Sequence, residues 1–218
     1  IAAYMSLLAN PKKKKNAAIL ENGEEIEIPR AEAPAYFEWI LWRAFLAINS
    51  LKAKPCKGFK LDQDFLPVGT APGNGPDLIF EFEDFVLVVE VTLTGNSRQE
   101  AAEGEPVRRH IAKVVEQYSG RKVFGLFIAN KIDTNTAETL RIGFWFKPDD
   151  SKMSLQVVPV TLQQFEALFS AGFRSGNISP RMVQEFMRDC LAVSNHDAPE
   201  WKRQIESTVQ ERVRNLIE

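Results

Sequence analysis

The chain has 218 residues, of which 44% are hydrophobic and 26% are charged, and its formal net charge is −2. This composition is typical of a globular protein that needs no disulfide or metal to hold its core, and it excludes a strongly basic chain that binds nucleic acid through overall charge. Two cysteines outside any motif, and no apolar run near the ~20 residues of a membrane helix, favour a cytoplasmic protein with reduced thiols and no membrane contact.

Residues 1–30 are predicted to be a linker or the end of an upstream domain. The chain begins with Ile1 rather than Met, from which we expect a piece of a longer protein. Residues 1–10 resemble the end of a helix. A proline, four lysines at 12–15 and the Asn22–Gly23 turn signal then indicate a linker or a short hairpin.

The next stretch is predicted to form one helix followed by a loop. Pro34 opens the segment 34–51, in which apolar residues recur at helical spacing. Residues 52–75 contain too many prolines and glycines for a long element, so we expect a loop with at most one short strand.

Two apolar runs, 77–82 and 85–93, predict strands joined by a turn at Glu83–Asp84. The segment 98–118 has a helical pattern, with a break expected near Gly104 and Pro106. In the run 121–130 apolar residues hardly alternate with polar ones, as expected for a central strand that is covered on both faces.

The remaining residues predict one more strand and three helices. The strand covers 154–161 and is a candidate edge strand; the helical patterns cover 162–170, 180–193 and 199–217. The order of elements therefore predicts an α/β fold with a mixed β-sheet flanked by helices, and 161–218 as a C-terminal helical extension packed on the core. No glycine-rich phosphate loop follows a strand, which disfavours nucleotide-binding enzymes.

Two carboxylates occur in segments that are otherwise suited to burial. Asp77 enters the first strand of the hairpin, and Glu90 lies near the end of the second. A buried carboxylate must be neutralised, paired or bound to a cation. Convergent carboxylates at strand ends suit Mg²⁺, which can activate water toward a phosphodiester. The simpler alternative is that both acids are solvated or paired with Arg108 or Lys122.

The hairpin "GPDLIFEFEDFVLVVEVTLT" resembles the core of the PD-(D/E)xK nucleases. The next residues, "RQEAAEGEPVRRH", resemble the cleavage domains of AlwI-like type IIS restriction and nicking endonucleases, including the paired subunits of heterodimeric ones. This resemblance covers residues 34–133. It implies a nuclease core at 31–160, a mixed sheet flanked by helices, and Mg²⁺-dependent hydrolysis of DNA phosphodiester bonds that leaves 5′-phosphate and 3′-hydroxyl ends.

Carried over by position, the resemblance implies a set of site residues. Asp77 and Glu90 match the metal-binding acids, and the carbonyl of Val91 matches a backbone ligand. The other matching positions are an acid on the early helix, a further acid, and a histidine that lines the same site: Glu38, Glu103 and His110. From the residues alone, Glu38 also fits a solvent-facing position, Glu105 competes with Glu103, and His110 also fits a packed or surface residue.

One position departs from the family pattern. The usual lysine two residues after the second acid is replaced by Thr92, which cannot supply a cationic amine. His110 and Gln99 are candidates for its replacement, with Lys113 one turn behind.

Positive charge is local. One cluster lies in the loop after the first long helix and another on the predicted helix that carries His110, and both are candidates to contact DNA phosphates or are simply solvated: Lys52, Lys54, Lys57 and Lys60, and Arg108, Arg109 and Lys113. The lysine block at 12–15 fits a linker at least as well.

The sequence thus predicts the catalytic domain of a site-specific endonuclease of the bacterial cytoplasm that acts on double-stranded DNA. Its partner would be a recognition domain on the same longer chain or a second nuclease subunit. The alternatives are a repair or structure-specific nuclease on the same core, and a catalytically silent module for DNA binding or subunit pairing. We expect weak DNA binding and poor site selection by this segment alone, because it contains no recognised DNA-reading motif.

Overall fold

The computed structural model describes residues 1–10, 16–48, 50–52 and 55–217. Along the chain the elements are α1 (Ala2–Ala9), β1 (Ala17–Ile19), β2 (Glu25–Glu27), a short 3-10 turn (Arg30–Glu32), α2 (Ala33–Leu46), β3 (Cys56–Lys57), β4 (Lys60–Leu61), β5 (Pro67–Gly69), β6 (Leu78–Glu81), β7 (Phe85–Thr92), α3 (Gln99–Gln117), β8 (Lys122–Ala129), α4 (Thr134–Ile142), β9 (Phe144–Phe146), β10 (Lys152–Ser154), β11 (Val157–Thr161), α5 (Leu162–Arg174), α6 (Pro180–Ala192) and α7 (Ala198–Ile217).

The centre of the fold is a five-stranded mixed sheet in the order β11-β8-β7-β6-β3. β6 and β7 form the predicted antiparallel hairpin, while β7, β8 and β11 run parallel to one another. Parallel neighbours need crossover connections, and α3 supplies the one between β7 and β8. The predicted mixed α/β architecture is confirmed, and so is the edge position of the last strand.

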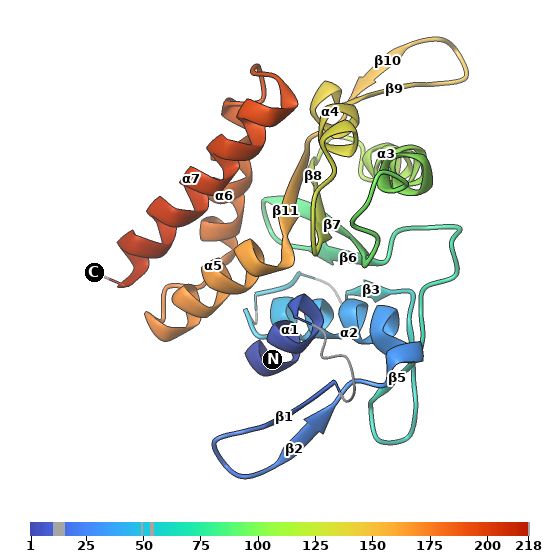
Figure 1. Cartoon of the computed structure of the whole chain (residues 1–218). Helices are drawn as coiled ribbons and strands as arrows, with labels where there is room; N and C mark the ends of the chain where they lie inside the picture. Colours follow the sequence, from blue (N-terminus) through green and yellow to red (C-terminus); the bar gives the residue numbers. More distant parts are fainter. Residues whose placement is uncertain (11–15, 49, 53–54, 218) are drawn as a thin grey trace.

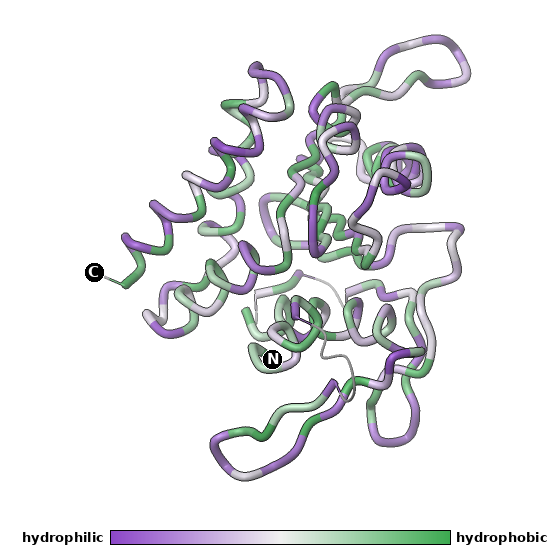
Figure 2. Tube along the Cα trace, in the orientation of Figure 1, coloured by the Kyte–Doolittle hydropathy of each residue, from purple (hydrophilic) through white to green (hydrophobic). Residues whose placement is uncertain are grey.

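Alternate residues of the central strands enter two separate cores. In β7, Leu87 and Val89 point into the larger core, which also takes residues from α1, α2, α5, α6 and α7. Val86 and Val88 point into the smaller core beneath α3 and α4. Figure 1 shows α3 and α4 together on one side and α5, α6 and α7 on the other. This two-sided burial explains the apolar composition of the strands, which Figure 2 shows at the centre of the molecule.

Helix α3 is continuous, whereas the sequence predicted a break near Gly104 and Pro106. One face of the helix buries Val107, His110 and Ile111, and this burial offsets the backbone hydrogen bond that proline cannot make. Gly125 on β8 lets α3 approach closely, because a Cβ there would lie 2.4 Å from Cδ1 of Ile111.

The two ends of the chain also contribute to the larger core. Met5, Leu7 and Leu8 of α1 are buried in it, and α7 adds Trp201 and Ile205. The predicted hairpin in the first segment exists as β1–β2, with its turn at Gly23. The lysine block at 12–15 lies outside the described residues, and the boundaries 1–30, 31–160 and 161–218 stay a prediction. Among the described residues, no helix is both long and apolar enough to cross a membrane.

Candidate active site

The hairpin β6–β7 brings Asp77 and Glu90 together. Leu78 pairs with Val89 in the antiparallel register, so the next step of the ladder places Asp77 opposite Glu90. The backbone N–H of Val91 donates to Oδ2 of Asp77 at 2.8 Å, which fixes that carboxylate beside the end of β7. The two acids expected to bind metal therefore meet where the sequence placed them.

Helix α3 adds His110 directly to Glu90. Nδ1 of His110 lies 2.9 Å from Oε1 of Glu90, and both residues are about 5% exposed. The other ring nitrogen, Nε2, is buried and makes no hydrogen bond of good geometry among the described residues, although the backbone of Gly73 lies near enough to raise the pKa of His110. A buried polar atom without a partner is costly, so Nε2 marks a place for a further polar group.

Glu38 reaches the same neighbourhood from α2. Its side chain is only 4% exposed, so the alternative of a solvent-facing position is wrong. The backbone N–H of Ala71 donates to Oε2 at 3.0 Å, and Oε1 lies 3.3 Å away from the same nitrogen. The loop before β6 thereby holds Glu38.

The acids act on one another through their charges. Burial raises the pKa of Glu38 to about 8, the charge of Asp77 adds to the rise, and the Ala71 N–H opposes it. Burial likewise raises the pKa of Asp77 to about 6, against the Val91 N–H and with the charge of Glu103. Burial, followed by the charges of Asp77 and Glu103, raises the pKa of Glu90 well above its ordinary value.

Of these two acids of α3, Glu103 is the one whose charge raises the pKa values of Asp77 and Glu90, whereas the charge of Glu105 acts on His110. Glu105 is exposed and forms an ion pair with Arg109 at 2.9 Å. The pKa of His110 is lowered, first by burial and then by the positive charges of Arg109 and Lys113. A neutral imidazole in contact with Glu90 has one donor and one acceptor nitrogen.

The donor chemistry of the cluster fits Mg²⁺. The charges of these carboxylates repel one another, and hard oxygen ligands are those that Mg²⁺ prefers. Within the described ranges, however, no three acidic, histidine or cysteine side chains converge closely enough to coordinate an ion. Asp77, Glu90 and Glu38 each hydrogen-bond to a protein group instead, so ion binding requires these side chains to reorient.

Gln99 and Lys113, two of the candidates to replace the missing lysine, lie in different surroundings. Gln99 is fully buried, and its Nε2 donates to the carbonyls of Thr94 and Lys131, while Oε1 accepts from the N–H of Asp133. Its amide has no donor left for a substrate, so the expectation of a catalytic Gln99 is wrong. Lys113 is exposed, and Thr92 accepts a hydrogen bond from the N–H of Thr94 at 3.1 Å.

Most of the predicted phosphate-binding cations contact protein groups. Lys52 lies 3.6 Å from Glu83, and Nζ of Lys57 donates to the carbonyl of Phe59. Nε of Arg108 donates to the carbonyl of Gly104. Lys60 is exposed, and Lys54 lies outside the described residues.

Gly58 is a part of the site that sequence reasoning missed. Its N–H donates to the carbonyl of Asp77 at 3.1 Å, and a Cβ on it would lie 2.4 Å from Cβ of Ala71. Gly58 thus allows the segment that holds Glu38 to pack against the segment that holds Asp77. The sequence signal was only one glycine among several in a loop.

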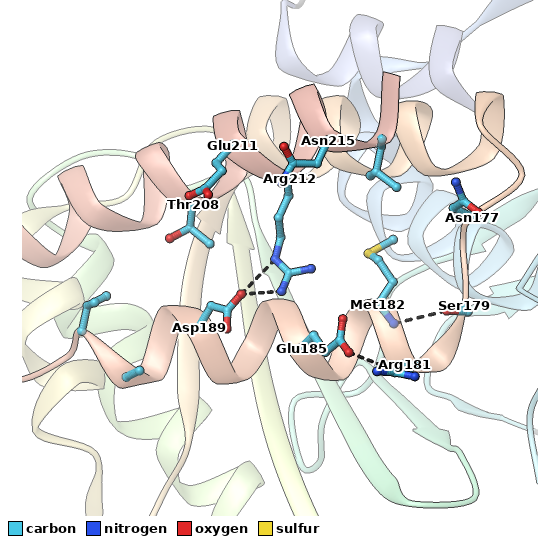
Figure 3. Close-up of a pocket in the computed structure, with 13 residues that line it drawn as sticks. Asn177, Ser179, Arg181, Met182, Glu185, Asp189, Thr208, Glu211, Arg212 and Asn215 are labelled. Atoms are coloured by element: carbon cyan, nitrogen blue, oxygen red, sulfur yellow. Dashed lines mark hydrogen bonds and ion pairs between the residues drawn. The ribbon is translucent and has the colours of Figure 1, made fainter. Parts of the chain in front are cut away.

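The cavity between α6 and α7, of about 610 Å³, is remote from these acids. Four of its charged side chains form two ion pairs, Arg212 with Asp189 and Arg181 with Glu185, as Figure 3 shows. None of the acids expected from the sequence lines this cavity.

Comparison with known proteins gives a family and similar solved structures. A family model described as AlwI restriction endonuclease matches residues 1–168. Among solved structures, the small subunit of the heterodimeric restriction endonuclease R.BspD6I is similar with a TM-score of 0.69 and 27% sequence identity, over 82% of this chain and 90% of that one. No curated protein matches.

Proposed function

The chain belongs to the AlwI restriction endonuclease family, and we propose that it hydrolyses phosphodiester bonds of double-stranded DNA with Mg²⁺ as its cofactor. The observation that carries the proposal is the buried contact of His110 with Glu90, which lies opposite Asp77 at one end of the β6–β7 hairpin. The charges of Glu38 and Glu103 also raise the pKa of Glu90. Carboxylates in such surroundings destabilise the fold when they ionise, and a bound cation would offset that cost.

Asp77, Glu90 and the carbonyl of Val91 would hold the ion, with Glu38 or Glu103 beside them. When bound, Mg²⁺ would polarise the scissile phosphodiester and acidify a water. The Val91 N–H orients the Asp77 carboxylate, and His110 orients that of Glu90.

His110 would position the attacking water or the phosphate. When Glu90 is ionised, as a metal ligand would be, it would accept from Nδ1–H and leave Nε2 as the acceptor of the neutral ring. Nε2 would then accept a hydrogen bond from the attacking water and orient its oxygen. The water oxygen would bond to phosphorus as the bond to the 3′ oxygen breaks, and the leaving 3′ oxygen would take up a proton, which gives 5′-phosphate and 3′-hydroxyl ends.

One such site cuts one strand, so we propose a type IIS or nicking enzyme that needs a second site for a double-strand break. The similar solved protein is a subunit of a heterodimeric enzyme, which supports a second nuclease subunit as partner. A recognition domain on the same longer chain is the other arrangement that would supply site selection.

The test is incubation of supercoiled plasmid with the protein and Mg²⁺, beside Asp77→Asn and the matched control Asp84→Asn. Asp84 is an exposed acid at the turn of the same hairpin. We expect open circles with wild type and Asp84→Asn, and none with Asp77→Asn. Full cleavage by Asp77→Asn would disprove the assignment of the metal site.

A catalytically silent subunit is the second candidate, favoured by Thr92 in place of lysine and by the reorientation that ion binding requires. Calorimetric titration with Mg²⁺ separates the two. A silent module would show no binding heat that depends on Asp77 and no plasmid cleavage.

A further inference from the structure

A second cavity lies beyond the same ends of the parallel strands as Glu90. It has a volume of about 650 Å³ and is lined by residues that follow β8, end β11 and belong to α7, among them Lys131, Thr161 and Lys202. Residues Thr92, Ala129 and Thr161 are aligned in the parallel register, so β7, β8 and β11 all end at this edge. The crevice beyond the carboxyl ends of parallel strands is where open α/β sheets bind ligands.

Lys202 is held with its ammonium group in this cavity. Nζ donates to the carbonyl of Ile132 at 2.8 Å and to Oγ1 of Thr134 at 3.3 Å. An ammonium group has three donors, so one remains. Burial lowers the pKa of Lys202, the charge of Asp133 opposes this, and the charge of Lys131 adds to the lowering. Lys131 and Lys202 both line the cavity.

Neither lysine forms an ion pair in the part of the chain that the structure describes. Asp133, the acid whose charge favours the protonated Lys202, accepts from the backbone N–H groups of Asn135 and Thr136 as the cap of α4. Glu206 also lines the cavity, where it accepts hydrogen bonds from the neutral amides of Gln164 and Gln210. Lys131 and Lys202 thus place two cations without a direct carboxylate contact, among the described residues, at one cavity, and such charges attract an anion.

The spacing along the edge suits a DNA backbone. The strands from β6 to β11 span three intervals of about 4.8 Å, or about 14 Å. One strand of a duplex rises about 3.4 Å per nucleotide, so this edge matches the rise of about four nucleotides. Lys131 is also fixed relative to the acids, because its carbonyl accepts from Gln99 at the start of the helix that carries His110.

We propose that this cavity binds a backbone phosphate of the DNA, within a few nucleotides of the phosphate that is cut, through the ammonium groups of Lys131 and Lys202. The inference rests on the proposed function and adds to it a contact that positions the substrate without reading its sequence. Lysine acts here as a point charge, which suits recognition of any backbone phosphate.

The experiment measures binding of a short fluorescent duplex in Ca²⁺, which takes the oxygen ligands of Mg²⁺ but is not expected to support cleavage. Wild type is compared with Lys131→Gln, Lys202→Gln and Lys122→Gln over a range of salt concentrations. Lys122 is the matched control: it is an exposed lysine on β8 at the opposite end from Lys131. Thermal melting of each variant checks the fold, and exposed Lys131 can be replaced with little disturbance.

Each of Lys131→Gln and Lys202→Gln should weaken binding about five- to tenfold at low salt, and should reduce the slope of log K against log salt by about 0.9. Lys122→Gln should do neither, and KM for plasmid cleavage should rise in the first two with kcat nearly unchanged. Equal effects of all three variants, or an unchanged slope in Lys131→Gln, would overturn the phosphate site while wild-type cleavage still stands. A wild-type protein that neither binds nor cuts DNA would overturn the proposed function together with this inference.

Discussion

Replacement of Glu38 by glutamine should stabilise the protein in the absence of divalent ions, increasingly so as the pH rises. The pKa of Glu38 is raised from 4.5 to about 8. An acid with a raised pKa binds more protons in the folded than in the unfolded state, so the stability it contributes is present below pH 4.5 and is lost as the pH rises toward 8. At pH 7, between the ordinary pKa of 4.5 and the raised pKa of about 8, the loss in the free energy of unfolding from Glu38 is at most about 3 kcal/mol.

Glutamine does not ionise, so Glu38→Gln removes the free-energy cost of a buried charge, and its amide oxygen can still accept from the Ala71 N–H. The assay is urea unfolding in EDTA at pH 5, 6, 7 and 8. We expect the difference in unfolding free energy between Glu38→Gln and wild type to grow from below about 1 kcal/mol at pH 5 to between about 1 and 3 kcal/mol at pH 7. Comparison at each pH cancels the titration of the other groups to first order.

Glu116→Gln is the control, because Glu116 is an exposed residue of α3. Its effect should stay within about 0.5 kcal/mol at every pH. A difference for Glu38→Gln that does not change between pH 5 and 8 would refute the reasoning, since it would mean that Glu38 is equally ionised in the folded and unfolded chains. Millimolar Mg²⁺ at pH 8 should reduce the advantage of the variant, because only wild type offers the ion this carboxylate.

Three further outcomes are expected. Gly58→Ala should lower the rate of plasmid cleavage at least about tenfold, because its Cβ would lie 2.4 Å from that of Ala71, whereas Gly69→Ala meets no atom within 4 Å and should keep the wild-type rate. Gln99→Leu leaves three backbone groups without partners and should lower the unfolding free energy in urea by about 2–4 kcal/mol, against little change for exposed Gln117→Leu. Ca²⁺ in place of Mg²⁺ should support DNA binding in a filter assay without nicking, and efficient nicking in Ca²⁺ would contradict an ion-generated nucleophile.

The secondary structure could be predicted where burial dominates the pattern. The runs at 85–93 and 121–130 became β7 and β8, because strands covered on both faces must be apolar throughout. The break expected at Pro106 does not occur. Proline disfavours a helix interior by about 3 kcal/mol, and the burial of one face of α3 outweighs this local preference. A local sequence pattern reflects the preferences of neighbouring residues and carries no information about the tertiary packing that can outweigh them.

The adjacency of Asp77 and Glu90 could be predicted from the sequence, but the groups that bind these acids could not. Asp77 and Glu90 are adjacent because a hairpin register brings them together, and hairpins are local. The groups that orient Glu38 and Glu90 come from the backbone of Ala71 and from His110 on another element. Any residue type supplies a backbone N–H, so no sequence pattern identifies the one that binds a given carboxylate.

The contacts of the basic residues also could not be predicted from the sequence. Lysines and arginines that cluster along the chain, such as Lys57 and Arg108, fold onto protein carbonyls, because neighbours in sequence also supply the nearest acceptors. Lys131 and Lys202 are far apart in sequence and line one cavity because the segment after β8 lies beside α7, where Lys202 donates to the carbonyl of Ile132. Neither lysine forms a direct ion pair among the described residues, and this follows from the packing of distant segments rather than from the local sequence. For the proposed phosphate contact, cations are therefore better sought where distant segments meet beyond the ends of parallel strands than in the densest run of basic residues.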